Sequence, residues 1–213
     1  MKTDDLIDIL SADVNAVDPQ RVKRVVLSFV SAALILALAG SVATLGAGWM
    51  DKFNSFGYLA FKISFGVSVV VLGTYLLLSH LRPGGKMQTF KWFALLPFGA
   101  VIGFAILELA LTPASHWNKL VVGTHWLECT GFIVATAFGS SILLLLAARQ
   151  AAPTDLAGTG ALLGLVSGGI GAVAYALHCA DDSVSFIAVW YGGAILFCAM
   201  PPASVRRRWQ GCG

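Results

Sequence analysis

The chain has 213 residues, of which 57% are hydrophobic and 12% are charged, and its mean hydropathy is +0.80. A soluble domain carries about twice that charged fraction, so the composition excludes an ordinary soluble domain. The net charge of +3 is small, so the placement of the charges carries more information than their sum. Long apolar runs follow one another with short polar breaks, which favours a single membrane-embedded bundle.

Residues 1–24 form the one sizeable polar segment of the sequence. Apolar side chains recur there at helical spacing and acidic residues fill much of the rest, which predicts an amphipathic helix that ends at Pro19. This helix either lies solvated at the membrane surface or offers its apolar stripe to a partner groove. Anionic lipid would repel an acidic helix, which favours the partner. The predicted partner-binding residues are Asp4, Asp5, Leu6, Ile7, Leu10 and Val14.

Six apolar segments follow, each about twenty residues long and able to cross roughly 30 Å of hydrocarbon. We expect helices, because every backbone polar group must be satisfied internally there. The predicted fold is therefore all-α, a polytopic bundle of six transmembrane helices after the short N-terminal helix. The spans are Val25–Gly48, Gly57–Ser79, Trp92–Leu111, Trp126–Ala148, Leu156–Leu177 and Val184–Ala203. The predicted division is 1–24, 25–204 and a basic tail at 205–213.

Basic residues set the orientation of these spans, since cytoplasmic loops carry an excess of Lys and Arg. Only Lys52 and Lys119 fall opposite the N-terminus, while Lys62 lies within the second span. The other eleven are Lys2, Arg21, Lys23, Arg24, Arg82, Lys86, Lys91, Arg149, Arg206, Arg207 and Arg208. Both termini are therefore predicted to be cytoplasmic. The arginines of the tail are expected to meet anionic lipid and not nucleic acid.

Two polar islands, Thr124–Cys129 and His178–Ser183, fall outside in this topology, and we expect the fold to bring them together. Cys129 and Cys179 have three interpretations: a structural disulfide or unrelated thiols, a redox or thiol-modification sensor, or part of a metal site. Thiolate and imidazole suit zinc or other soft divalent ions. The tentative ligands for such an ion are His125, Cys129, His178, Cys179 and Asp181.

Lys62 and Glu108 are ionisable groups inside apolar runs, where an unpaired charge is costly. We predict a mutual ion pair between the second and third spans. The alternatives are that Lys62 snorkels to the interface or that the two groups belong to an ion path.

The fifth span carries Gly160, Gly164 and Gly168 at four-residue spacing, with Gly169 and Gly171 beside them. Small residues in such a row let another helix approach closely. Packing inside the bundle is the simpler interpretation, and a homodimer face is the alternative.

Motifs of catalysis are missing from the sequence. It contains no phosphate-binding glycine loop, no two-histidine zinc-protease helix and no Cys-x-x-Cys pair. We therefore predict that the protein is not an enzyme. A small-cation or metal transporter or channel is the main alternative to a signalling role, and a membrane thiol oxidoreductase is the third.

Two stretches resemble a known family. The start, Met1-Lys2-Thr3-Asp4-Asp5-Leu6-Ile7, and the motif His178-Cys179-x-x-Asp182-Ser183-x-x-Phe186-x-x-x-Trp190-x-Gly192 are similar to those of the NrsF family, negative regulators of sigma F. The resemblance covers nearly the whole chain. It implies a membrane-bound anti-sigma factor in the bacterial inner membrane, whose partner is an extracytoplasmic-function sigma factor.

The resemblance also implies how the protein works. The cytoplasmic N-terminal segment would hold the sigma factor, and an external stress such as a toxic metal or an oxidant would release it. The family's paired cysteines match Cys129 and Cys179. Because residues 1–24 are short, the inner loops at Thr89–Lys91 and Arg149–Asp155 would contribute to the sigma-binding surface.

Overall fold

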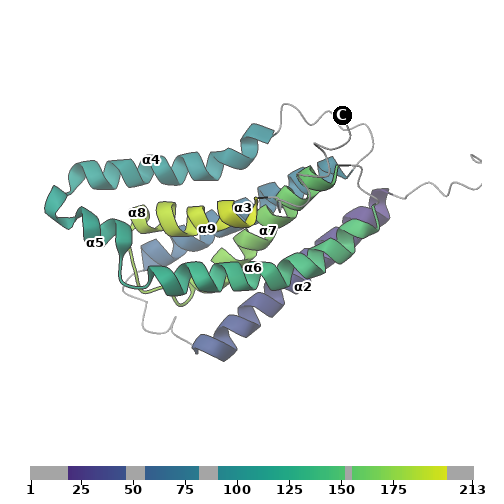
Figure 1. Ribbon diagram of the computed structural model, residues 1–213, viewed down its shortest axis with the longest axis horizontal. Coiled ribbons are helices and arrows are strands. Elements are labelled where there is room, and N and C mark those ends of the chain that lie inside the picture. The colour runs from purple at the N-terminus through teal and green to yellow at the C-terminus, as the bar shows by residue number, and fades with distance from the viewer. Residues whose placement is uncertain (1–18, 47–55, 82–90, 152–154, 201–213) are drawn as a thin grey trace, which may run out of the picture.

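The computed structural model describes residues 19–46, 56–81, 91–151 and 155–200 (Figure 1). Among these residues there are helices and turns and no strand, which confirms the predicted all-α class. The long helices are α2 (Pro19–Leu45), α3 (Phe56–His80), α4 (Leu96–Leu111), α6 (Trp126–Arg149) and α7 (Leu156–Ala176). The short ones are η2 (Lys91–Leu95), η3 (Ala114–His116), α5 (Trp117–Val122), α8 (Val184–Phe186), the π-helical turn η4 (Ile187–Tyr191) and α9 (Gly192–Cys198).

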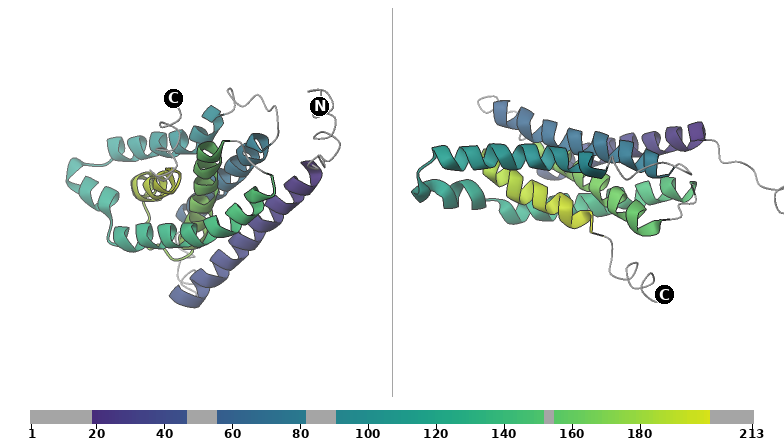
Figure 2. Two further views of the ribbon diagram at one scale, coloured as in Figure 1. Left: turned by 45° about the vertical axis from the view of Figure 1, so that its right-hand side comes forward. Right: turned by 90° about the horizontal axis from the view of Figure 1, so that it is seen from above.

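Helix α7 is the centre of the bundle, with α2 and α4 on opposite sides of it (Figures 1 and 2). Every residue from Leu163 to Ala176 is buried, and α7 packs most extensively on α3 and α6. Gly164 and Gly168 face α9, Gly169 faces α3 and Gly171 faces α6. From Gly164 to Gly171 the glycine row therefore packs inside the bundle, as predicted, and this part is not available to a second copy of the chain, whereas Gly160 has no close neighbour.

Five segments are long and apolar enough to cross a membrane, judged by length and composition. They are Gln20–Leu45, Phe56–His80, Trp92–Leu111, Ala114–Arg149 and Leu156–Ala176. The sixth predicted span is a shorter apolar helix, Val184–Cys198, which includes the π turn. Leu36, Phe104 and Phe138 are more than half exposed on the outside of the bundle. Aliphatic and aromatic side chains of this kind fit a hydrocarbon surrounding better than water.

The first long helix begins at Pro19, earlier than the predicted start of the span at Val25. Proline suits the first turn of a helix, because the N–H that it lacks would have no partner there. Exposed Arg21 and Arg24 are thus part of the first membrane-length helix. Three predictions concern residues outside the described ranges. They are the N-terminal helix with its six contact residues, the end of the sixth span at 201–203 and the basic tail at 205–213.

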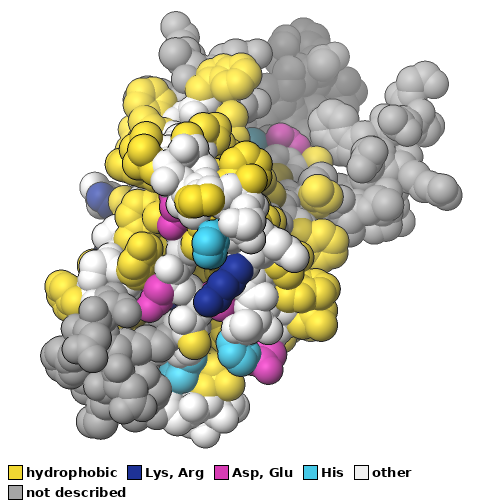
Figure 3. Space-filling view, turned by 90° about the vertical axis from the view of Figure 1, so that its left-hand side faces the viewer, with side chains coloured by type: hydrophobic (Ala, Val, Ile, Leu, Met, Phe, Trp, Pro, Cys, Tyr) yellow, Lys and Arg dark blue, Asp and Glu magenta, His cyan; other side chains and the backbone are white. Residues whose placement is uncertain are grey.

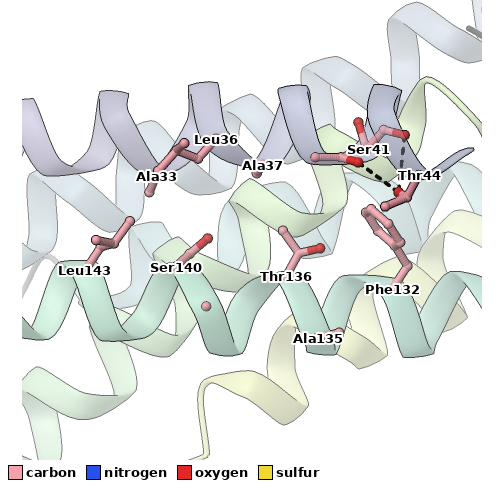
Figure 4. A pocket seen from close by; sticks show the side chains of 12 residues that line it. Ala33, Leu36, Ala37, Ser41, Thr44, Phe132, Ala135, Thr136, Ser140 and Leu143 are labelled. Carbon is pink, nitrogen blue, oxygen red and sulfur yellow. Dashed lines mark hydrogen bonds between the residues drawn. The ribbon is translucent and has the colours of Figure 1, made fainter. Parts of the chain in front are cut away.

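A groove of about 470 Å³ lies between α2 and α6, as Figure 4 shows. Its walls are mostly small or apolar side chains. The hydroxyls of Ser41 and Thr44 donate to the carbonyls of Leu38 and Gly40 on their own helix, at 2.9 and 2.8 Å. With these hydroxyls engaged in α2, the groove presents an apolar surface that hydrocarbon can fill.

Candidate functional site

Polar side chains gather at the end of the bundle where α4 turns into α5 and where α7 ends. Figure 3 views this end and shows histidine, lysine and acidic side chains grouped among hydrophobic ones. An open cavity of about 550 Å³ lies here, lined by residues that include Glu108, Lys119, Asp181 and Asp182. The segment 178–185 leads from α7 into α8 and runs through this polar cap. It contacts five other parts of the chain: the ends of α2 and α5, helices α3 and α4, and the loop before α6.

Asp181 joins the two polar islands. Its carboxylate accepts hydrogen bonds from the backbone N–H of Thr124 at 3.1 Å and of His125 at 2.9 Å, and from the Thr124 hydroxyl at 3.0 Å. Partial burial acts to raise the pKa of the Asp181 carboxyl, but these hydrogen bonds outweigh it and lower the pKa below its usual value. The prediction that the fold brings the islands together is confirmed.

A glycine lets this contact form. Gly123 ends α5 with a φ of +64°, in the left-handed region that favours glycine. A β-carbon there would come within 2.9 Å of the Asp181 carboxyl carbon and 2.7 Å of the Phe186 ring. The loop before α6 therefore approaches segment 178–185 only because position 123 has no side chain.

Glu108, near the end of α4, caps the last apolar helix. Its carboxylate accepts the N–H groups of Val184 at 3.1 Å and Ser185 at 2.8 Å, and the Ser185 hydroxyl at 2.6 Å. Ser183 adds the local cap, since its side chain accepts from the N–H of Phe186 at 3.1 Å. The N–H groups of the first turn and a carboxylate at the positive end of the helix stabilise each other.

Lys62, on α3, is 1% exposed and binds segment 178–185 from another side. Its ammonium donates to the Asp182 carboxylate at 2.8 Å and to the carbonyl of Cys179 at 3.1 Å. The predicted Lys62–Glu108 ion pair is therefore wrong. Each charge is satisfied by segment 178–185 instead, because that segment supplies both a carboxylate for the ammonium and helix N–H groups for the carboxylate.

The remaining residues of the motif also make defined contacts. The His178 ring contacts the carbonyl of Gly46, directly after the end of α2. The Ser183 hydroxyl donates to the carbonyl of Leu120 at 2.6 Å, and the Trp190 indole donates to that of Val121 at 2.8 Å. Segment 178–185 and the helix that follows it are thereby tied to the ends of α2 and α5.

Cys129 and Cys179 are both fully buried and belong to one hydrophobic cluster, which also contains Phe186 and Tyr191. Both cysteines are free in this structure. Cys179 is part of segment 178–185, and both thiols are enclosed at the end of the bundle where this segment lies.

The five tentative metal ligands do not form a metal site. Among the described residues, no three His, Cys, Asp or Glu side chains lie where they could hold a metal ion. The Asp181 carboxylate is occupied by backbone N–H groups, and His125 Nδ1 lies 3.0 Å from Glu128. The His178 ring contacts Gly46 at the end of α2. Local bonds have thus taken up most of the groups that the metal hypothesis required.

At the opposite end of the bundle, α3 meets the start of α7. His80 Nε2 lies 3.6 Å from a carboxylate oxygen of Asp155, and Asp155 caps α7 by accepting the N–H of Gly158 at 2.9 Å. The distribution of Lys and Arg predicts that this end faces the cytoplasm, and this orientation stays a prediction.

These features define an all-α protein with several helices of membrane-spanning length and a polar cap at one end. The chain belongs to the NrsF family, described as negative regulator of sigma F, whose family model matches residues 10–209. It is 32% identical over 205 residues to the anti-sigma-F factor NrsF of Caulobacter vibrioides, covering 92% of each chain. It is 27% identical over 203 residues to the probable anti-sigma-F factor NrsF of Azospira oryzae, covering 90% of each. No solved structure matches the chain.

The sequence pattern identifies most residues of the polar cap but not their partners. Asp182 and Ser183 belong to the family motif with no role evident from the sequence, and in the structure they are the counterion of Lys62 and a helix cap. A serine directly before an apolar run is a signal for a helix start, and this signal identifies Ser183 as the N-cap of α8. No local signal identifies Asp182 as the partner of Lys62.

Proposed function

We propose that the chain is a membrane anti-sigma factor that holds an extracytoplasmic-function sigma factor at the inner membrane and releases it on external stress. The observation that carries this proposal is the family match over residues 10–209, together with the curated relatives named as anti-sigma-F factors. Helices of membrane-spanning length support the membrane location. The excess of Lys and Arg in alternate loops supports cytoplasmic termini.

The sigma factor would bind the acidic N-terminal segment, through Asp4, Asp5, Leu6, Ile7, Leu10 and Val14. Opposite charge would speed the encounter and fix the orientation, while apolar burial would supply most of the affinity. This segment is directly followed by α2, so a movement of α2 would reach the bound sigma factor.

The external signal would act on the thiols of Cys129 and Cys179. A two-electron oxidant would take two electrons and two protons from the pair as a disulfide forms. A thiophilic metal ion would instead displace the two protons and bind the sulfurs. Because both thiols are buried and Cys179 is part of segment 178–185, either event would strain the contacts of that segment.

A contact joins segment 178–185 to α2, and α2 follows the N-terminal segment in the chain. Segment 178–185 includes Cys179 and, through His178, contacts Gly46 at the end of α2. A signal works through such a contact only by binding one arrangement better than the other, so the modified thiols must favour a shifted segment.

Removal of residues 2–18 tests the anti-sigma role. Because α2 begins at Pro19, the shortened protein should keep its bundle and reach the membrane. We expect a reporter gene that depends on the sigma factor to be expressed constitutively, as in a strain lacking the whole protein. An immunoblot of the membrane fraction, with a variant truncated after Trp209 as control, checks that the protein is present. Continued repression by the protein lacking residues 2–18 would contradict the proposal.

Serine substitution at Cys129 or Cys179 tests the sensor role. Each variant loses one sulfur of the pair, so the response of the reporter to peroxide or to a thiophilic metal ion should be altered in both. Cys198→Ser is the matched control, since Cys198 ends α9 and packs against Gly164 and Gly168 in the first half of α7, whereas the polar cap lies where α7 ends. Normal induction in both test variants would contradict the sensor role but not the anti-sigma role.

A cation transporter or channel gains no support from the cap. Lys62 and Glu108 are the ionisable groups that the alternative would use, and both are engaged by segment 178–185. A homodimer stays a prediction, and its interface would have to lie on a surface other than the glycine row of α7.

A further inference from the structure

Lys62 is an ammonium group at 1% exposure within a membrane-length helix. A buried charge persists only where other groups compensate for its lost hydration. The compensation here comes from two atoms of one segment, the Asp182 carboxylate at 2.8 Å and the Cys179 carbonyl oxygen at 3.1 Å. The charge of Lys62 is thus satisfied only while residues 179–182 stay in their present place.

Asp182 and Lys62 differ in their access to water. The Asp182 side chain is 25% exposed and lines the open cavity of the cap, whereas Lys62 is enclosed. If segment 178–185 moves outward, water can hydrate the carboxylate, but the ammonium is left without a counterion inside the bundle. This asymmetry adds to the other contacts that hold the segment in place, because an outward movement would also strand the Lys62 charge.

The thiol of Cys179 lies on the same short stretch of backbone. Its Sγ lies 3.7 Å from the carbonyl oxygen of Asp181. Lys62 binds the backbone carbonyl of Cys179 directly. The ammonium therefore helps to hold the stretch of backbone that keeps this thiol buried.

We propose that Lys62 is a positioning residue that, through Asp182 and the Cys179 carbonyl, latches segment 178–185 in place, so that the thiols of Cys129 and Cys179 stay buried and access to them is limited. The latch deepens the proposed function, on which its role in signalling rests: it would set how strong a stress must be before the thiols react. Its physical part, the burial of Cys179, needs no sigma factor and is tested without one.

The test follows the reaction of Cys179 with a maleimide reagent in the reduced, full-length protein purified in detergent, measured by mass spectrometry of the peptide that contains it. We expect Asp182→Asn to raise the rate at least tenfold, since the ammonium loses its counterion. Lys62→Met should raise it less, because the remaining carboxylate is already part-exposed. The double variant should react more slowly than Asp182→Asn alone, because no charge is stranded.

Lys119→Met is the matched control, since Lys119 is an exposed cation that lines the same cavity. In this variant Cys179 should react at the same rate as in the unchanged protein. Unchanged rates in both single variants, or a double variant as fast as Asp182→Asn, would overturn the latch. If Asp182→Asn alone does not accumulate in the membrane, the double variant must do so, and its failure would also overturn the proposal. Loss of reporter repression after removal of residues 2–18 is independent of all these outcomes.

Discussion

Replacement of Glu108 by leucine should lower the free energy of unfolding by about 3 kcal/mol, since hydrogen bonds to a charged group contribute roughly 1.5–3 kcal/mol each and do not add fully. Three donors of segment 178–185 would lose their acceptor: the N–H groups of Val184 and Ser185 and the Ser185 hydroxyl. The side chain of Ser185 is 1% exposed, so water cannot easily replace the carboxylate. Reversible unfolding in mixed detergent micelles measures the change.

Two further variants make the Glu108 result specific. Glu108→Gln keeps one carbonyl oxygen as an acceptor but no charge, so about half of the loss is expected. Glu128→Gln removes a carboxylate that is 72% exposed and pairs with His125 at the surface, where ion pairs contribute little. Equal stabilities of the leucine and glutamine variants of Glu108, or a loss as large for Glu128→Gln, would show that the helix cap is not the source of the effect.

The long helices could be predicted from the sequence because their cause is local. A run of apolar residues must satisfy its backbone internally, so hydropathy alone places the element. The predicted span Gly57–Ser79 differs from α3 by one residue at each end. The last span was predicted less well, because Val184–Cys198 contains a π-helical turn and is shorter than the hydropathy of the region suggests.

The pairing of charges could not be predicted in the same way. Lys62 and Glu108 were matched because they are the two charges inside apolar runs, but the choice of partner depends on how each helix is rotated about its axis. That rotation is set by close packing with α7, where Gly66 and Gly73 of α3 lie against Val173 and Val166. Hydropathy carries no information on rotation, so the sequence identified the charged residues and not their partners.

The packing of α9 against α7 leads to the second large effect. Gly164→Ala should destabilise the protein by about 2 kcal/mol, within the range of roughly 1–3 kcal/mol for overpacking a tight contact. An added β-carbon at this position would overlap the carbonyl oxygen of Cys198 and lie 2.7 Å from its carbonyl carbon. These are backbone atoms, which cannot turn away as a side chain can, so α9 would have to move off α7.

Gly160 gives a matched control for which the opposite change in stability is expected. Gly160 lies one turn earlier on α7, and a β-carbon there would meet nothing within 4 Å. Alanine is favoured over glycine inside a helix by about 1 kcal/mol, so Gly160→Ala should be neutral or stabilising. At Gly164 the same gain is outweighed by the overlap. Thermal unfolding of both variants in detergent, followed by circular dichroism, measures the difference, and equal stability of the two would show that α9 does not depend on this close approach.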